Sequence, residues 1–334
     1  MTIKQIVEKF VENPERMRMG TKKLASRYRT NEASIIEARA VARGLKPYPT
    51  VKSECGNIIS VVEKIDILYS KPVFPTTKII TTQKQKRVGM HIVLGCSHVP
   101  FQNKKMQQGI INLIEDLGNK IKGFHLIGDI LDMNSLSAHE PNKVPLPGIT
   151  LGYEYAEGNK YLNSFENVLP RNIDKTYIYG NHEDRYRRHI SDINNSKYAD
   201  ALMSPRQALN LDARGYLVKD NWKEDYVFLG EHLQLIHGEF CTKYPARTHV
   251  DRMKASVMFA HTHRIDINYD GEKAGFNIGW GGDAEAPAFN YVSRLTKMNW
   301  INGFAIVHVD ENGNYFTQVI PVFNDEFWYN GKRY

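Results

Sequence analysis

The sequence predicts an α/β protein that begins with a small all-helical module. From residue 91 onward, short apolar runs of strand length alternate with helical patterns, whereas residues 1–46 carry helical patterns alone. Several of the apolar runs also end in residue types that bind metal ions. A chain of 334 residues is long enough for one large domain and a small module.

The N-terminal segment is expected to form three short helices. Apolar residues recur at helical spacing over residues 3–11, and Asn13-Pro14 ends that helix. Thr21 can cap a second helix and Asn31 a third, which Gly44 closes. The second and third helices, joined by a tight turn, fit a helix-turn-helix. A three-helix docking module without DNA affinity is the alternative.

The positive charge of the chain is concentrated at its front end. The net charge is +7, residues 1–50 contribute +6, residues 51–90 contribute +4, and the remainder is mildly acidic. This asymmetry predicts that the front end contacts a polyanion, although a solvated basic face without a partner is equally compatible with it. The predicted DNA-contacting residues are Lys22, Lys23, Arg27, Arg29, Arg39 and Arg43.

Three regions follow from these patterns: residues 1–46 as the helix-turn-helix, 47–89 as an extended connector, and 90–334 as the main domain. The connector is rich in proline and threonine. In the main domain, helical faces are expected over residues 105–118 and 154–168. A hairpin is expected where 305–309 and 315–320 flank Asn312-Gly313.

Five apolar runs in the main domain end in potential metal ligands. The carboxyl ends of strands in an open α/β sheet share one edge, so the residues that follow them should surround one crevice. The five endings are Cys96-Ser97-His98, Asp129-Ile130-Leu131-Asp132, Asn181-His182-Glu183-Asp184, His237-Gly238 and His261-Thr262-His263.

Carboxylate, imidazole and amide groups together suit divalent transition metals such as Mn²⁺, Fe²⁺ or Zn²⁺. Asp129 lies between two groups of ligands in the sequence and can bridge two ions. Two adjacent ions can clamp a phosphate and activate a nucleophile. His182 is the natural proton donor for the leaving oxygen, because histidine titrates near neutral pH.

These motifs resemble those of the calcineurin-like metallophosphoesterase superfamily over about residues 90–320. Gly128-Asp129-x-x-Asp132, Gly180-Asn181-His182-Glu183, His237-Gly238 and Ala260-His261-x-His263 stand in the superfamily's order. The stretches 180–185 and 97–101 resemble the bacterial and phage branch related to DNA-repair exonucleases. The resemblance implies two mixed β-sheets packed as a sandwich with flanking helices (α/β/β/α).

The resemblance also implies a role for each matching residue. Asp129 would bridge two divalent ions, His182 would be the general acid, and Asp132 would orient it. One ion would be held by Asn181, His237 and His261, and the other by His98 and His263. Arg185, which follows the acid motif, could grip a phosphate or belong to a solvated helix face.

The first motif departs from the superfamily's Asp-x-His, because Cys96 stands in place of the aspartate. A Cys96 thiolate can ligate, and it would then favour Zn²⁺ or Fe²⁺ over Mn²⁺. Alternatively that ion binds weakly, or Cys96 is a buried residue that packs like a small hydrophobe. Ala260 in place of the usual glycine is a milder departure.

Three functions are compatible with the sequence. The first is a phosphodiesterase or nuclease that acts on nucleic acid, and the second is a small-molecule or nucleotide phosphatase or phosphodiesterase with the same site. The third is a DNA-binding protein of phage type whose site has degenerated, and Cys96 is the feature in its favour. A homodimer is an expectation of the resemblance alone.

The bulk composition predicts a soluble globular protein. Charged residues make up 24% of the chain, and no apolar run approaches the roughly 18 residues of a membrane span. The first residues mix charges into their apolar positions, unlike a secretory signal. Three cysteines are too few for a disulfide framework, so a cytoplasmic protein is expected, with no membrane partner. The resemblance implies that the cell is a bacterium or a phage-infected host.

Overall fold

The computed structural model describes residues 3–12, 21–30, 35, 38, 88–137, 146–192 and 194–334. The chain divides into two units, 1–82 and 83–334. Most of the expected third helix lies outside the described residues, as do residues 47–87 of the expected connector and two of the predicted DNA contacts, Arg39 and Arg43.

The first unit contains α1 (Ile3–Glu12) and α2 (Thr21–Tyr28), both where the apolar spacing predicts them. Their facing sides form a small core, in which the rings of Phe10 and Tyr28 meet edge to face with centroids 6.3 Å apart. Ile35 and Ala38 are helical and belong to the same core. Lys22, Lys23, Arg27 and Arg29 are exposed, as the amphipathic pattern of α2 requires.

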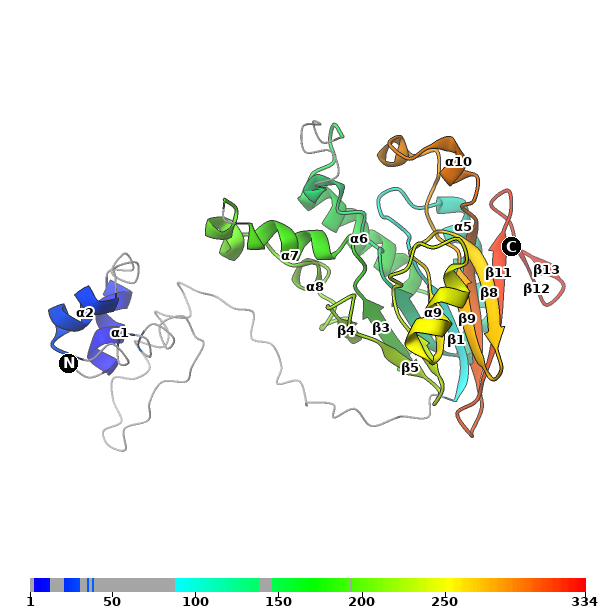
Figure 1. Cartoon of the computed structure of the whole chain (residues 1–334), viewed down its shortest axis with the longest axis horizontal. Coiled ribbons are helices and arrows are strands. Elements are labelled where there is room, and N and C mark those ends of the chain that lie inside the picture. The colour runs from blue at the N-terminus through cyan, green and yellow to red at the C-terminus, as the bar shows by residue number, and fades with distance from the viewer. Residues whose placement is uncertain are drawn as a thin grey trace. The chain divides into compact units, whose positions relative to one another are not determined.

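The second unit contains two mixed β-sheets with helices outside them (Figure 1). In the first sheet the strands run in the order β11-β10-β1-β2-β3-β4, with β1 to β4 mutually parallel where they pair. In the second sheet the order is β5-β6-β7-β9-β8, and β6, β7 and β9 are parallel. The strands are β1 (Gly89–Leu94), β2 (Ile121–Ile127), β3 (Asp174–Ile178), β4 (Tyr216–Lys219), β5 (Val227–Leu229), β6 (Leu233–Leu235), β7 (Ser256–Phe259), β8 (Ile265–Asp270), β9 (Lys273–Ile278), β10 (Asn302–Val309) and β11 (Tyr315–Val322), followed by the small pair β12 (Trp328–Tyr329) and β13 (Lys332–Arg333).

The two longest α-helices of this unit begin at residues that cap them. The side chain of Asn103 accepts hydrogen bonds from the amides of Lys105 and Met106 at the start of α5, and Thr150 caps α6 in the same way. The helices are α5 (Lys104–Leu117), α6 (Leu151–Glu166), α7 (Asp184–Ser191), α8 (Pro205–Ala208), α9 (Pro245–Met253) and α10 (Arg294–Lys297), with 3₁₀ turns at Gly118–Lys120, Asn134–Leu136, Ser196–Ala201 and Pro287–Phe289.

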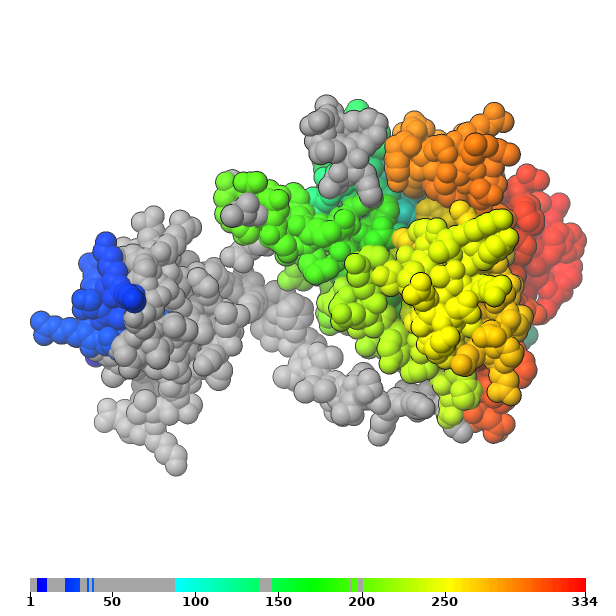
Figure 2. All heavy atoms as spheres, viewed as in Figure 1, coloured from blue at the N-terminus to red at the C-terminus, as the bar shows by residue number. Residues whose placement is uncertain are grey.

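Successive side chains of a strand point to opposite faces of its sheet, and so they pack in different layers of the sandwich. Ile92 and Leu94 of β1 pack in the core that contains α5 and α6, whereas Val93 points to the core between the two sheets. In β7, Met258 joins the inter-sheet core, whereas Phe259 packs with Ala246 of α9 on the outer face. In the space-filling view, the yellow segment that contains α9 forms part of the near face of the second unit (Figure 2). The architecture is therefore helix, sheet, sheet, helix, as expected.

Among the described residues, no helix combines the length and the apolar character that spanning a membrane would require.

Candidate metal centre

The five predicted strand endings meet at one place in the second unit. Three of them follow β1, β2 and β3 in the first sheet, and the other two follow β6 and β7 in the second. The two sheets face each other, so their carboxyl ends bring the endings together. Cys96, His98, Asp129, His237 and His263 are all buried there.

One group of side chains gathers around His98. Its Nε2 atom lies 3.0 Å from Nε2 of His263 and 3.9 Å from Oδ2 of Asp129. The Cys96 sulfur lies with these two imidazoles in a cluster whose ligand atoms are within 4.8 Å of one another. Two imidazole nitrogens directed at one point are the arrangement that a shared cation requires.

A second group gathers around His237, on the other side of Asp129. Its Nε2 atom lies 3.3 Å from Oδ2 of Asp129, 3.0 Å from Oδ1 of Asn181 and 3.1 Å from Nδ1 of His261. The Nδ1 atom of His237 lies 3.1 Å from the Ile127 carbonyl oxygen, to which it can donate, so Nε2 is left as the ligand atom. The same oxygen of Asp129 thus faces both groups.

Burial sets the protonation of most of these imidazoles. It lowers the pKa of His98 and His263, and it lowers the pKa of His261 to about 3. Burial alone would also lower the pKa of His237, but the Asp129 carboxylate raises it above its ordinary value. The three lowered groups are neutral at pH 7, which is the form that binds metal ions.

The pKa values of Asp129 and Cys96 shift in opposite directions. Burial would raise the pKa of Asp129, but the surrounding histidines, His237 first, hold it well below the ordinary value, so the group is a carboxylate. Burial and the charge of Asp129 raise the pKa of the Cys96 thiol, against the effect of a hydrogen bond from the His261 amide. A cation that binds the Cys96 sulfur must therefore displace a proton.

His182 lies beside the two groups and not within them. Its Nδ1 atom is 2.6 Å from the Asp132 carbonyl oxygen and 3.3 Å from Oδ1 of the same residue. Its Nε2 atom faces Oδ2 of Asp129 at 3.9 Å. Asp132 also lies 3.0 Å from Nδ1 of His98, so this carboxylate orients both imidazoles. Hydrogen bonds to both histidines help to hold the pKa of Asp132 below its ordinary value, against the effect of burial.

Arg185 is buried, and its guanidinium turns toward the loop that carries Asp132. It donates to the carbonyl oxygens of Asp132 and Met133 at 2.9 and 3.4 Å, and its other terminal nitrogen lies 3.3 Å from Nε2 of His182. The phosphate-binding role predicted for Arg185 remains a prediction. Its observed contacts join the acid candidate to the Asp132 loop.

Glu183 holds the Asp129 loop in place, a role that the sequence reasoning missed. Its carboxylate accepts hydrogen bonds from the amides of Asp129, Ile130, Leu131 and Gly180 at 2.8–3.0 Å and from the Tyr177 hydroxyl at 3.0 Å. The signal available in the sequence was a carboxylate placed directly after Asn181-His182, at the end of an apolar strand.

Several of the candidate ligands have strained backbone. Cys96, His98, Asp129, His261 and His263 all have φ between 49 and 60°. This left-handed region is unfavourable for residues with a Cβ atom, and such residues concentrate at functional sites. Nearby, Gly180 approaches Asp129 so closely that a Cβ atom at this position would collide with the carboxylate.

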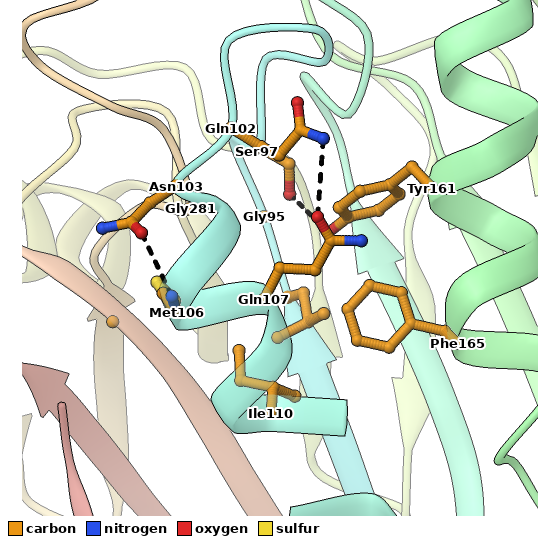
Figure 3. Close-up of a pocket in the computed structure, with 12 residues that line it drawn as sticks. Gly95, Ser97, Gln102, Asn103, Met106, Gln107, Ile110, Tyr161, Phe165 and Gly281 are labelled. Carbon is orange, nitrogen blue, oxygen red and sulfur yellow. Dashed lines mark hydrogen bonds between the residues drawn. The ribbon is translucent and has the colours of Figure 1, made fainter. Parts of the chain in front are cut away.

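Ser97 points away from the cluster, in contrast to Cys96 and His98 on either side of it. Its hydroxyl lies 2.7 Å from the Tyr161 hydroxyl of α6, beside a cavity of about 10 Å³ that Gln102 and Gln107 also line (Figure 3). A volume of that size holds about one water molecule. This contact fixes the loop after β1 to the outer helix layer.

Aromatic side chains pack against His98 and His263 at the candidate metal centre. The ring of His263 stacks on Trp280 with centroids 4.5 Å apart and meets Trp300 edge to face at 4.6 Å. Phe289 meets His98 edge to face at 5.4 Å. At the other end of the centre, Trp222 lies 6.0 Å from His237. These rings surround the imidazoles with low-dielectric material, which strengthens their interaction with a cation.

Comparisons with known proteins gave similarities of structure alone. No family model and no curated protein matches the sequence. The solved structures similar to this chain include vacuolar protein sorting 29 from Cryptosporidium parvum (TM-score 0.41, 14% identity, covering 74% of this chain and 98% of that one). They also include Vps29 from Entamoeba histolytica in complex with Zn²⁺ (0.35, 13%, 73% and 96%) and the Pseudomonas putida nuclease MPE (0.31, 11%, 68% and 87%). At these values the similarities carry no argument about function, which rests on the residues described above.

Proposed function

We propose that this protein is a metal-dependent phosphoesterase of the calcineurin-like superfamily and that it hydrolyses phosphodiester bonds in nucleic acid. The observation that carries the proposal is the convergence of His98 and His237 on the single carboxylate of Asp129, with His263 3.0 Å from His98. The donor set of nitrogen, oxygen and sulfur atoms fits divalent Zn²⁺, Fe²⁺ or Mn²⁺.

Divalent ions held there would withdraw charge from the phosphate and lower the pKa of an attacking water. Asp129 would be shared by the two ions, with Asn181, His237 and His261 on one side and His98 and His263 on the other. The surrounding aromatic rings would limit the access of bulk water to the phosphate.

His182 would give a proton to the leaving oxygen. Its Nδ1 hydrogen is directed at the Asp132 carbonyl oxygen, 2.6 Å away, so Nε2 is the nitrogen that faces the Asp129 side of the centre. Arg185 and Asp132 fix the imidazole in this orientation. Nε2 accepts from Arg185 in this orientation, so His182 would give up that contact when Nε2 is protonated to serve as the donor.

The catalytic test uses the full chain loaded with Zn²⁺, Fe²⁺ or Mn²⁺. Bis-p-nitrophenyl phosphate and DNA should be hydrolysed, and His182→Ala should lower kcat by about 10²–10⁴-fold. His232→Ala, at an exposed position outside the centre, is the matched control and should leave kcat unchanged. Retained turnover in His182→Ala would remove His182 from the mechanism.

A substrate panel separates the remaining functions. Cleavage of monoesters or mononucleotides without cleavage of DNA would favour a small-substrate phosphatase. A protein that holds its metal ions but hydrolyses none of the substrates would favour a degenerate site.

The exposed cations of α2 and of the residue that follows it support nucleic acid as the substrate. Lys22, Lys23, Arg27 and Arg29 can bind phosphates, because no acidic residue lies within α2 to neutralise them. Replacing all four by alanine should weaken DNA binding and reduce the slope of log K against log salt by about 0.9 for each phosphate that is no longer neutralised. Hydrolysis of bis-p-nitrophenyl phosphate should be unchanged. Equal DNA affinity in the variant and the parent would exclude this surface.

A further inference from the structure

The Cys96 sulfur has a fixed position at the centre. Cys96 lies two residues after Leu94, the last residue of β1, has φ 49° and is completely buried. The backbone amide of Cys96 donates to the Gly128 carbonyl oxygen at 2.8 Å, and its own carbonyl oxygen accepts from the Gly281 amide at 3.1 Å. The backbone on both sides is therefore held by other loops, and the sulfur has little freedom to move.

The sulfur belongs to both groups of candidate ligands. It forms one compact cluster with His98 and His263 and another with Asp129 and His237, and within each cluster the ligand atoms lie within 4.8 Å of one another. Ligands of one Zn²⁺ ion, at about 2.0–2.3 Å from it, are separated by distances of this order. The sulfur therefore lies within reach of both positions that a cation would take.

From this double membership we infer that Cys96 is a bridging ligand, whose thiolate is shared by two ions beside the carboxylate of Asp129. The inference rests on the dinuclear site of the proposed function. A thiolate sulfur carries enough lone pairs to bind two cations, and the backbone amide of His261, 3.0 Å away, also donates a hydrogen bond to it.

A shared thiolate has a consequence for metal selection. Sulfur is a soft ligand, so each of the two ions gains a preference for Zn²⁺ or Fe²⁺ over Mn²⁺. A terminal thiolate would give this preference to one ion only. Replacing Cys96 by aspartate supplies oxygen in place of sulfur and should raise the affinity for Mn²⁺ relative to Zn²⁺ at least tenfold.

X-ray absorption at the zinc edge counts the sulfur atoms bound to each ion. The full-length protein would carry Cys55→Ser and Cys241→Ser, so that Cys96 is its one thiol, and would be loaded with two equivalents of Zn²⁺. A bridge predicts about one sulfur per zinc at about 2.3 Å. A terminal ligand predicts about half a sulfur per zinc, and a buried free thiol predicts none. Either of these values would overturn the inference.

Three further measurements check the interpretation of the sulfur count. Elemental analysis must give two zinc ions per chain, and a value of one would exclude a bridge. Cadmium-113 NMR of the doubly loaded protein should show both resonances at thiolate-like shifts, and Cys96→Asp should move both, whereas a terminal thiolate would move one. Circular dichroism reports whether Cys96→Asp is folded. None of these readouts uses hydrolysis, so an inactive protein with a sulfur bridge would refute the proposed function and not the bridge.

Discussion

Glu183→Gln tests whether one buried carboxylate holds the metal-binding loop. Oε2 of Glu183 accepts from the amides of Asp129 and Gly180, and Oε1 accepts from the amides of Ile130 and Leu131 and from the Tyr177 hydroxyl. A glutamine places an NH₂ group at one of these two positions. It therefore turns an acceptor of at least two hydrogen bonds into a donor that faces them.

The magnitude follows from the number of donors left without an acceptor. Each buried donor without an acceptor costs about 1–3 kcal/mol, so two of them cost roughly 2–6 kcal/mol. Burial and the charge of Asp129 raise the pKa of Glu183, whereas hydrogen bonds from the backbone amides lower it. Glutamine carries no charge, so the favourable interaction of the carboxylate with these amides is lost. The free energy of unfolding of an ordinary domain is about 5–15 kcal/mol, so the loss is a substantial fraction of it.

Urea denaturation followed by tryptophan fluorescence measures this loss. Glu272→Gln, at an exposed position in the turn between β8 and β9, is the matched control and should change the free energy by less than about 0.5 kcal/mol. Zinc affinity should also fall in Glu183→Gln, because in either orientation of the glutamine at least one amide of the Asp129 loop loses its acceptor. A change below about 1 kcal/mol in Glu183→Gln would refute the reasoning.

Three other predictions concern the same unit. Gly180→Ala should abolish metal binding, because the new Cβ atom collides with Asp129; Gly152→Ala, with no atom within 4 Å of its Cβ position, should bind zinc normally in calorimetry. Removal of metal by a chelator should lower the free energy of unfolding, by about 2.7 kcal/mol relative to protein at a free metal concentration of 100 times Kd, and unchanged thermal melting would contradict a native site. Burial raises the pKa of Glu154 from 4.5 to about 7, so the folded protein keeps a proton that the unfolded chain releases, and this stabilisation is lost as the pH rises from about 4.5 to 7. Glu154→Gln should therefore reduce the difference in unfolding free energy between pH 5 and pH 8 by up to about 3 kcal/mol, and equal differences in variant and parent would exclude Glu154 as the titrating group.

The layered fold could be predicted because its signals are local. The apolar run before Cys96 becomes β1, and the helical faces expected over residues 105–118 and 154–168 appear as α5 and α6 with shifts of a few residues at their ends. Element boundaries depend on capping: Thr150 caps α6 through the Tyr153 amide and so starts the helix earlier than its apolar face does. The two-sheet arrangement came from the resemblance alone, because strand pairing is a long-range property.

The sequence predicted which residue types make up the candidate site. It did not predict how their side chains are arranged. The motifs contain Glu183 and Cys96, but the five hydrogen bonds to Glu183 and the double membership of Cys96 depend on which loops meet. Arg185 illustrates the same limit. Its position after the acid motif indicated a phosphate contact, whereas the folded chain directs its guanidinium to two carbonyl oxygens.

The left-handed backbone conformations of the candidate ligands should couple metal binding to the stability of the fold. Each such conformation costs about 1–3 kcal/mol, and it persists only where the surrounding contacts hold it. The His98 amide donates to the Asp129 carbonyl oxygen at 2.9 Å, and the His261 amide donates to the Cys96 sulfur at 3.0 Å, so the strained residues hold one another. The ligand loops therefore form one cooperative set, in which loosening Asp129 also releases His98. Metal affinity and unfolding free energy should consequently fall together in variants of any of these loops. Variants of α9 at positions other than His249, which accepts from the Glu239 amide after His237, should lower stability and leave metal affinity unchanged.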